Sequence, residues 1–343
     1  MKHIRRSLMA ALLVTASLTG SSLAQPQGPP QPIALGANPF PPAPVAPPPP
    51  PASELVEPRI ILGAEYLLLA PRRSGQTYAI VGRNPFWGPQ GEIKSLDGGY
   101  DSGFRLSAGF RAPEAPWEMV LRYTYFHGDN DASYQGTADT AIFPTLTHPI
   151  TMQRAQAVYA SNHVQFHLAD LELTRLVPFD NLGNLRVFAG PRFVNVEQGI
   201  GATYQAGNGA VAQTCRWSEF NGGGLRAGAE SEVWFADCLG LYLRGSATLM
   251  TGHFTNSRTE LVNSTTIVDV GERTTRLIPM MDLGVGLNFR RNNWRLSIGY
   301  EFMNWFDMVD SSDFSDDANP SKLQRASSNL GFDGLVFRAE VSF

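Results

Sequence analysis

Apolar and polar residues alternate with a period of two along most of the chain from Arg59 onward. In residues 101–111, for example, Phe104, Leu106, Ala108 and Phe110 face one way and alternate with Arg105, Ser107, Gly109 and Arg111. Because successive side chains of a β-strand point to opposite faces, this alternation predicts strands rather than helices. We expect ten strands, near residues 59–69, 101–111, 116–127, 163–177, 184–198, 218–235, 239–254, 276–290, 294–306 and 332–343.

The predicted strands are joined alternately by short and long connections. The long connections have about 19 to 35 residues, and the short ones are Ala112–Ala115, Pro178–Gly183, Ala236–Cys238 and Arg291–Asn293. A transmembrane barrel distributes its periplasmic turns and extracellular loops in this way, and tilted strands of about ten residues cross a bilayer. Alternation alone also fits a soluble β-sandwich, but the unequal connections favour the barrel.

Aromatic residues and the last strand support this interpretation. Trp117, Trp234 and Trp294 fall at the predicted periplasmic strand ends, and the opposite ends carry Tyr125, Phe126, Trp305 and Phe306. Two aromatic girdles are expected where rings meet the lipid headgroups. The chain ends on an alternating strand that resembles the insertion signal read by the barrel-assembly machinery, with Phe337, Val341 and Phe343 on one face.

We therefore predict an all-β fold, a transmembrane antiparallel up-and-down β-barrel of about ten strands, or twelve if Thr259–Val270 adds a hairpin. One stretch breaks the alternation, because its apolar residues change from even to odd positions: Val164, Phe166 and Leu168, then Ala169, Leu171 and Leu173. A β-bulge near Leu168 would restore the register and direct Asp170 and Glu172 into the lumen.

Two segments precede the predicted barrel at residues 59–343. Residues 1–24 are typical of a secretory signal peptide, with Lys2, Arg5 and Arg6 before an apolar run and small residues before the cleavage site. Residues 25–58 hold 14 of the 25 prolines and predict an extended periplasmic linker, either a spacer or a contact with the cell wall. Both termini of the barrel are expected in the periplasm, and the barrel in the outer membrane of a Gram-negative-type bacterium.

Composition and charge exclude several classes of protein. Only 17% of the residues are charged, the net charge is −4, and basic runs are missing, which argues against nucleic-acid binding. The two cysteines, Cys215 and Cys238, flank one predicted strand and should lie near opposite membrane faces. A disulfide requires Cα atoms closer than about 7 Å, so we expect no bond between them.

The polar face of the predicted strands carries nearly equal numbers of cationic and anionic side chains. Its cations are Arg105, Arg111, Arg122, Arg186, Arg192, Arg226, Arg244, Arg290, Arg295 and Arg338. Its anions are Glu65, Glu118, Asp170, Glu172, Glu230, Glu232, Asp282, Glu301 and Glu340. These charges could form an ion-pair network that fills a narrow barrel or a constriction that sets selectivity. The selectivity candidates are Arg105, Arg122, Arg186, Arg192, Arg226, Arg244, Arg295, Glu172, Glu230, Asp282 and Glu301.

Three sequence blocks carry a family resemblance: Gly222–Gly245, Leu277–Phe306 and Asn329–Phe343. They resemble the Legionella-type pore-forming major outer membrane protein family and the related barrel porins of planctomycetes. The resemblance covers most of the chain after Arg59 and is strongest after Gly222. It implies a pore-forming outer-membrane barrel and supplies no catalytic motif or cofactor.

The histidines and the acidic loops give little indication of a metal site. His127, His148, His163, His167 and His253 fall in the predicted extracellular half. His163 and His167 share a strand face, but no acidic or cysteine residue stands at ligand spacing in the sequence, so no metal site is expected. Asp129-Asn130-Asp131 imitates a calcium loop without its later ligands. An acidic loop, either solvated or able to bind divalent cations, contains Asp307, Asp310, Asp313, Asp316 and Asp317.

The sequence leaves three hypotheses of function. The first is a pore that passes ions or small solutes passively, and the second is a structural or adhesive surface barrel with a plugged lumen. The third is a barrel enzyme, for which His127 beside Asp129 and Asp131 is the one dyad-like grouping. Motifs for nucleotide binding, nucleophile elbows and zinc proteases are missing, so we expect no enzyme. The expected partners are outer-membrane lipid and the assembly machinery; the oligomeric state stays open.

Overall fold

The structure, a computed structural model, describes residues 59–83, 90–113, 115–137, 139–148, 151–179, 183–314 and 323–343. The predicted signal peptide 1–24 and linker 25–58 lie outside the described residues. Within those residues, no helix is long and apolar enough to cross a membrane.

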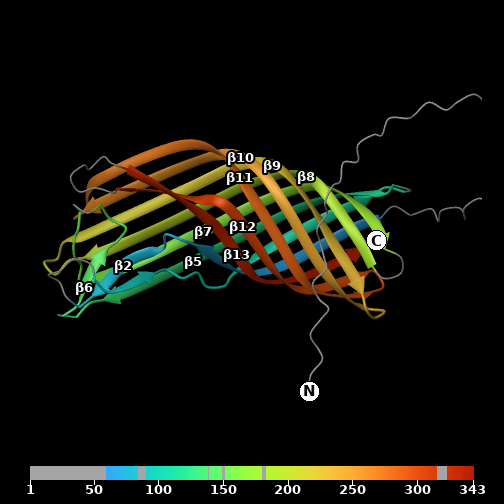
Figure 1. Ribbon diagram of the computed structural model, residues 1–343, viewed down its shortest axis with the longest axis horizontal. Helices are drawn as coiled ribbons and strands as arrows, with labels where there is room; N and C mark the ends of the chain where they lie inside the picture. Colours follow the sequence, from blue (N-terminus) through green and yellow to red (C-terminus); the bar gives the residue numbers. More distant parts are fainter. Residues whose placement is uncertain are drawn as a thin grey trace, which may run out of the picture. The chain divides into compact units, whose positions relative to one another are not determined.

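Ten antiparallel strands form a closed barrel, which confirms the predicted fold class and excludes the twelve-strand alternative (Figure 1). Around the barrel, the strands follow the order β1-β13-β12-β11-β10-β9-β8-β7-β5-β4, and β4 pairs with β1 to complete the ring. The strands are β1 (Arg59–Arg73), β4 (Asp101–Arg111), β5 (Trp117–Gln135), β7 (Ala157–Phe179), β8 (Gly183–Gln205), β9 (Val211–Trp234), β10 (Leu239–Val262), β11 (Thr265–Arg291), β12 (Trp294–Phe314) and β13 (Leu323–Ser342).

Most strands continue past their predicted limits at the long-loop end, the end opposite the short turns. β10 runs to Val262 and β11 begins at Thr265, so the expected loop there is a two-residue turn. Asn263 and Ser264 have φ of 47° and 68°, the left-handed backbone that tight hairpin turns require. The predicted long loop was wrong at this place because both strand faces become polar beyond the lipid, and the alternation that marks a strand disappears.

Three short strands form a separate sheet near the long-loop end: β2 (Thr77–Gly82), β3 (Glu92–Ser95) and β6 (Ala141–Pro144), in the order β3-β2-β6. Their apolar residues join a buried cluster with the upper barrel wall that includes Tyr78, Ile142, Val158 and Tyr204. The hydroxyl of Tyr204 donates a 2.5 Å hydrogen bond to the carbonyl oxygen of Tyr78. This sheet therefore packs against the barrel rather than extending freely from it.

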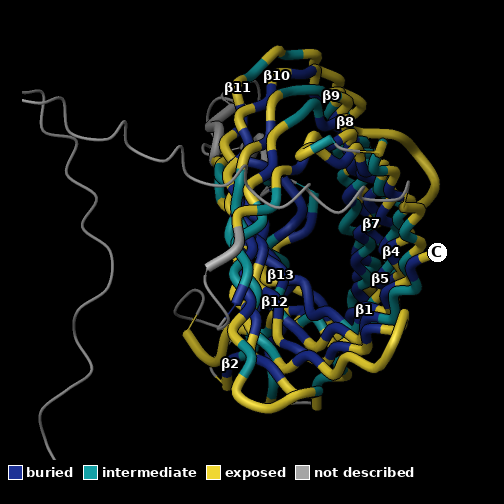
Figure 2. Tube along the Cα trace, turned by 90° about the vertical axis from the view of Figure 1, so that its right-hand side faces the viewer, coloured by how far each residue is buried: buried dark blue, intermediate teal, exposed yellow. Residues whose placement is uncertain are grey.

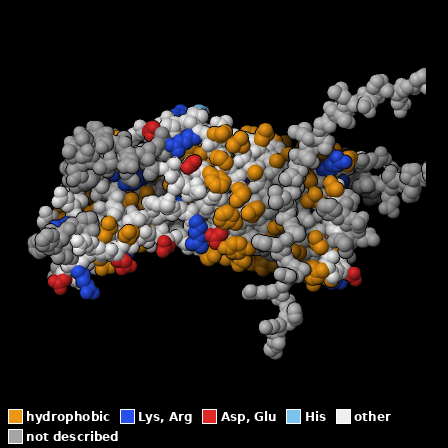
Figure 3. Space-filling view, in the orientation of Figure 1, with side chains coloured by type: hydrophobic (Ala, Val, Ile, Leu, Met, Phe, Trp, Pro, Cys, Tyr) orange, Lys and Arg blue, Asp and Glu red, His pale blue; other side chains and the backbone are white. Residues whose placement is uncertain are grey.

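The outer face of the barrel is apolar over the half nearest the short turns (Figure 3). We call this half the lipid belt. Its exposed side chains come from every barrel strand; among them are Leu62, Phe104, Leu121, Leu173, Val187, Leu225, Leu241, Leu283, Ile298 and Phe337. Exposed tryptophans mark its short-turn margin at Trp117 and Trp294, as the sequence predicts. The third tryptophan prediction for this margin was wrong: Trp234 is half-buried on the inner face of β9, where Arg290 stacks over its ring.

The predicted β-bulge near Leu168 was wrong. β7 pairs with β5 in one unbroken register from Ala157 to Arg175, and its even-numbered residues point inward throughout. Val164, Phe166 and Leu168 therefore face the lumen together with Asp170 and Glu172. The change from even to odd apolar positions along β7 reflects a lumen that is apolar around Val164–Leu168 and charged at Asp170 and Glu172, not an extra residue in the strand.

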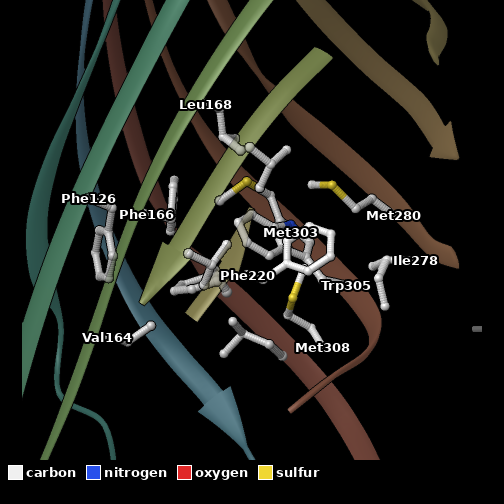
Figure 4. Close-up of a cluster of buried hydrophobic side chains, with 14 of the residues drawn as sticks. Phe126, Val164, Phe166, Leu168, Phe220, Ile278, Met280, Met303, Trp305 and Met308 are labelled. Atoms are coloured by element: carbon white, nitrogen blue, oxygen red, sulfur yellow. The ribbon is translucent and has the colours of Figure 1, made fainter. Parts of the chain in front are cut away.

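The predicted girdle at the long-loop margin was also partly wrong, since Phe126 and Trp305 point into the barrel and are fully buried. They belong to an apolar cluster inside the lumen (Figure 4). Figure 2 shows the buried residues along the inside of the strand ring and the exposed ones along its outside. The core of this protein is therefore the interior of the barrel itself.

Phe343 lies where the first and last strands close the ring. Its amide donates a 2.9 Å hydrogen bond to the carbonyl of Ile60, the amide of Ile60 donates to its carbonyl at 3.1 Å, and its ring is 68% exposed. If the ring belongs to an insertion signal, Phe343→Asp should reduce the amount of barrel in the outer membrane severalfold without changing its expression, as immunoblots of membrane fractions would measure.

The matched control is Phe235→Asp, since Phe235 lies beside the turn at the same end and is 64% exposed. A surface aromatic substitution of that kind changes stability by about 0.5 kcal/mol or less. Equal losses of both variants would contradict a signal specific to the last residue.

Candidate functional site

The half of the lumen nearest the short turns holds a network of ion pairs on inward-facing positions of the strands. Arg192 on β8 donates to both oxygens of Asp170 on β7, at 2.6 and 2.9 Å, and to Asp282 on β11, at 3.1 Å. Arg226 on β9 reaches the same two aspartates at 3.3 and 3.4 Å and also pairs with Glu172. Because β8 and β11 are not neighbours, the contact of Arg192 with Asp282 crosses the lumen.

The network continues toward the short-turn end. Arg122 lies 3.2 Å from Glu172, and Arg244 lies 3.9 Å from both Glu172 and Glu230. The ring of Phe188 stands beneath two guanidinium groups, those of Arg226 at 5.0 Å and Arg244 at 5.4 Å. This arrangement desolvates the arginines on one side and directs their donors to the carboxylates.

The remaining pairs connect the opposite side of the ring. Arg338 on β13 binds Glu65 at 2.8 Å and reaches Glu230 on β9 at 3.4 Å. Arg105 binds Glu65 at 2.5 Å and Glu301 at 3.1 Å. Arg295 pairs with Glu232 and Glu340 and lies 3.8 Å from Glu230. Glu230 therefore links the two halves into one continuous network.

Glycines in two neighbouring strands make room for a large side chain within this network. Tyr242 is buried, and the guanidinium of Arg338 stacks over its ring at 5.5 Å. A Cβ atom at Gly299 would lie 2.1 Å from the Tyr242 hydroxyl oxygen, and one at Gly286 would lie 2.6 Å from its ring. Gly286 on β11 and Gly299 on β12 thus leave the space that the Tyr242 ring occupies inside the barrel.

The predicted selectivity residues lie inside the barrel. Each is buried or half-buried on the inner face: Arg105, Arg122, Arg186, Arg192, Arg226, Arg244, Arg295, Glu172, Glu230, Asp282 and Glu301. Arg290, which was also assigned to the lumen, is exposed at the short-turn mouth and stacks on the ring of Trp234 at 4.8 Å. Proximity to the mouth leaves it in water.

Cavities border the network on its short-turn side. One of about 110 Å³ opens at the mouth between Arg59, Arg186 and Arg290, and one of about 30 Å³ lies deeper, between Arg122, Glu172 and Arg244. Both are lined by Ile61, Arg186 and Glu340, so they adjoin. The deeper one has room for an ordered water molecule.

Above the ion pairs, an apolar cluster closes the lumen (Figure 4). Nine of the ten barrel strands contribute to it. The ring of Phe166 on β7 lies 5.1 Å from that of Trp305 on β12 and 5.0 Å from that of Phe332 on β13. β7 and β12 are separated by four strands in either direction around the ring, so they stand on opposite walls. Opposite walls are therefore in van der Waals contact at this level.

A third level at the long-loop end is filled by the segment that follows β6. The carbonyl oxygen of Leu146 accepts from Arg216 at 2.9 Å and from Arg258 at 3.1 Å. Glu260, which is fully buried, accepts from the amide of His148 at 2.9 Å and from the hydroxyl of Thr151 at 3.1 Å. Charged side chains of β9 and β10 therefore hold this segment inside the barrel at its long-loop end.

A cavity of about 640 Å³ lies at the long-loop mouth, between Arg72, Asp97, Asn162 and Ser328. Arg73 lines it and donates to the carbonyl oxygens of His163 at 3.3 Å and Gly199 at 3.5 Å. Burial lowers the pKa of the Arg73 guanidinium to about 10. The long-loop mouth therefore carries a polar recess above the apolar cluster.

A histidine cluster, of which the sequence indicated only His127 beside Asp129, lies on the outer wall above the lipid belt. His163 Nδ1 and His127 Nε2 each lie 2.7 Å from an oxygen of Asp129. Desolvation opposes the charge of Asp129, but the hydrogen bond from His163 and the proximity of His127 outweigh it and lower the pKa of the carboxyl group. The partner of His163 is thus Asp129 across the β5–β7 pairing, not His167 on its own strand, and only the register could have revealed it.

The other sequence candidates have simpler environments. Cys215 is exposed and Cys238 half-buried, and both are free. The calcium-like Asp129–Asp131 run is part of β5 and does not form a loop. Of the acidic loop, Asp307 is exposed and accepts from the hydroxyl of Ser327 at 3.2 Å; Asp310 and Asp313 belong to β12, and Asp316 and Asp317 lie outside the described residues.

Comparison with known proteins gives one family match. The family described as Legionella pneumophila major outer membrane protein precursor matches residues 57–343. No curated protein sequence matches the chain.

Among solved structures, the outer membrane protease OmpT from Escherichia coli aligns over 85% of this chain and 99% of its own, with 7% identity and a TM-score of 0.47. The Ail attachment invasion locus protein of Yersinia pestis aligns over 84% of this chain and 99% of its own, with 10% identity and a TM-score of 0.24. A Pseudomonas aeruginosa FadL homologue aligns over 84% and 90%, with 10% identity and a TM-score of 0.23.

Removing one member of the ion-pair network tests how much the network contributes to the free energy of unfolding. Asp170→Ala should lower the free energy of unfolding by about 3–5 kcal/mol, because Arg192 and Arg226 both lose a buried counter-charge. Denaturant unfolding of the purified barrel in detergent measures this loss. Asp269→Ala, at an exposed position near the β10–β11 turn, should change it by about 0.5 kcal/mol or less. A small effect at Asp170 would mean that water solvates the network.

Proposed function

We propose, from the premise that this chain belongs to the Legionella pneumophila major outer membrane protein family, that it is a structural outer-membrane barrel whose lumen is closed at rest. The observation that carries this proposal is the 5.1 Å separation between the rings of Phe166 and Trp305 on opposite walls. An eight-stranded barrel is filled by its side chains, whereas barrels of 16 strands leave a channel. A ten-stranded barrel that brings bulky rings together across its axis belongs with the filled ones.

The levels above and below the rings support the same conclusion. On the long-loop side, Gln198 on β8 donates a 3.1 Å hydrogen bond to the carbonyl of Met308 on β12. On the short-turn side, Arg192 crosses to Asp282 at 3.1 Å. Ions would have to displace paired charges, then apolar rings, and then the segment around Leu146. Breaking a buried ion pair alone costs several kcal/mol.

A narrow or gated pore for ions is the second candidate. The cavities favour it, because those between Arg122, Arg186 and the short-turn mouth adjoin, and a further cavity of about 640 Å³ lies at the other mouth. Only the apolar level and the anchored segment above it would then need to move. Charged residues along such a path would set its ion selectivity.

Conductance in planar bilayers distinguishes the two candidates. The closed barrel should give no steady conductance steps, whereas the double variant Phe166→Ala/Trp305→Ala should conduct, because it removes the contact between the walls. Each substitution costs about 3–5 kcal/mol, so folding is checked by the heat-dependent shift in gel mobility. The control Leu171→Ala/Leu283→Ala alters only lipid-facing residues and should stay silent.

Steady conductance of the unaltered protein would overturn the closed barrel and support the pore. In that case Arg122→Glu/Arg244→Glu, which replaces two cations by two anions at the deeper cavity, should shift selectivity toward cations. An unchanged reversal potential would place the permeation path elsewhere. Silent membranes from folded protein favour the structural function.

We further propose that the protein is not an enzyme. Its outer His127–Asp129 pair lies on a convex wall, and the Asp129 side chain is 60% exposed. Such a position offers no enclosure to exclude water from a reacting group. In this proposal, lipid covers the belt and the assembly machinery reads the last strand. The linker expected at residues 25–58 either contacts the cell wall or acts as a spacer.

The two cysteines test the proposed orientation, because Cys215 lies at the long-loop end and Cys238 beside the short β9–β10 turn. A membrane-impermeant maleimide applied to intact cells should label Cys215 and spare Cys238. Maleimide reacts with the thiolate, so labelling should be faster at mildly alkaline pH than at neutral pH. Labelling of Cys215→Ser on intact cells would instead place the short-turn end outside.

A further inference from the structure

The histidine cluster on the outer wall is built by three side chains from two paired strands. Asp129 on β5 lies directly opposite His163 on β7, and His127 precedes Asp129 by two residues on the same face. Strand pairing fixes the relative positions of these Cα atoms, since the β5–β7 register has no shift from Trp117 to Gln135. The cluster therefore lies on a rigid part of the fold, above the lipid belt.

One carboxylate lies between two imidazole nitrogens in this cluster. Asp129 Oδ1 is 2.7 Å from His163 Nδ1, and Oδ2 is 2.7 Å from His127 Nε2. One ligand atom from each residue can be chosen so that all three lie within 4.8 Å of one another. Ligand atoms around a tetrahedral Zn²⁺ ion are separated by about 3.3 Å, so shifts of roughly 1 Å at the side-chain ends would close the site.

A chain of hydrogen-bonding contacts through Gln165 orients the ring of His127. Gln165 Nε2 donates to His167 Nε2 at 3.0 Å, and the Nδ1–H of His167 then donates to the Tyr123 oxygen at 2.7 Å. With its amide oriented in this way, Gln165 presents Oε1 to His127 Nδ1 at 3.4 Å. The Nδ1–H of a neutral His127 therefore faces Gln165, and its Nε2 lone pair faces Asp129.

A lone pair and a carboxylate oxygen at 2.7 Å repel one another, so either a proton, which makes the pair an ordinary ion pair, or a metal ion lies between them. An acceptor that binds the far nitrogen of a ligating histidine is the usual arrangement at metal ions. Gln165 holds this position for His127. The geometry thus contains both the ligands of a metal ion and the group that orients one of them.

We propose that His127, Asp129 and His163 bind a divalent transition-metal ion, of which Zn²⁺ is the representative, on the outer wall of the barrel. Two imidazoles and one carboxylate suit such ions, whereas Ca²⁺ and Mg²⁺ require oxygen ligands. The Asp129 side chain is 60% exposed, so the ion keeps at least one coordination position open to water or to a group from another molecule.

Trp217 gives the site a fixed wall and a local reporter. Its ring stacks on His163 with centroids 5.6 Å apart and an angle of 11° between the planes. The contact forms because Gly199, which lies between these residues on β8, has no side chain, and a Cβ there would be 3.0 Å from the Trp217 ring. The indole thus restricts the rotation of His163 and lies beside the ion.

Zn²⁺ titration of the full-length protein, purified in detergent and measured by calorimetry, tests the site. We expect one ion per chain, and at least a tenfold weaker binding in each of His127→Ala, Asp129→Asn and His163→Ala. His253→Ala is the matched control, because His253 is an exposed histidine on the same outer face whose Nδ1 bonds Thr275 Oγ1 at 2.9 Å. Cys215→Ser is the second control and should also bind normally.

Fluorescence locates the ion independently of affinity. Cu²⁺ at one equivalent should quench the emission of Trp217, and Zn²⁺ should compete with this quenching; the quenched component should be missing in Trp217→Phe. Heat-dependent gel mobility confirms that each variant is folded. Absence of stoichiometric Zn²⁺ binding, or binding that survives all three ligand substitutions, overturns the proposal, as does loss of binding in Cys215→Ser alone.

Discussion

Closure of the strand ring is the constraint on which the rest of this structure depends. Once β1 pairs with both β4 and β13, every second residue of ten strands must point into one shared interior. Polar groups there cannot turn outward, because the other face of the strand meets lipid. The interior must therefore satisfy its charges internally, and the arginines that bridge to carboxylates across or along the lumen are the result.

The division of the lumen into a charged and an apolar level follows from the same constraint. Replacing buried ion pairs by apolar residues is often neutral or stabilising, so an interior made only of charges is no requirement of stability. Above Asp170, β7 carries Leu168, Phe166 and Val164, and the opposite wall presents Trp305 and Met303. Aromatic rings and methionine side chains fill the space between the walls and need no hydrogen-bond partners. They therefore keep the lumen closed beyond the level of the ion pairs.

The sequence was sufficient for the fold and for the identity of the inner face, because both depend on a local period of two. Ten strands and the burial of Arg192, Glu230 and Asp282 follow from that period. Its limits are visible at Phe166 and Trp305, whose apolar character suggested lipid or headgroup contact although they lie in the lumen. Alternation distinguishes two faces but does not say which is inside when the interior itself becomes apolar.

Contacts between strands lay beyond the sequence for a different reason. His163 and Asp129 are 34 positions apart, and their 2.7 Å contact exists only because β5 and β7 pair in one particular register. A register shifted by one residue would turn one partner inward, and a shift by two would separate His163 from the carboxylate. The same pairing that places Phe166 inside the barrel therefore assembles three potential ligands on the outside, a short way along the same strand at His163. The pairing of β5 with β7 therefore determines both the apolar closure of the lumen and the position of the histidine cluster on the outer wall.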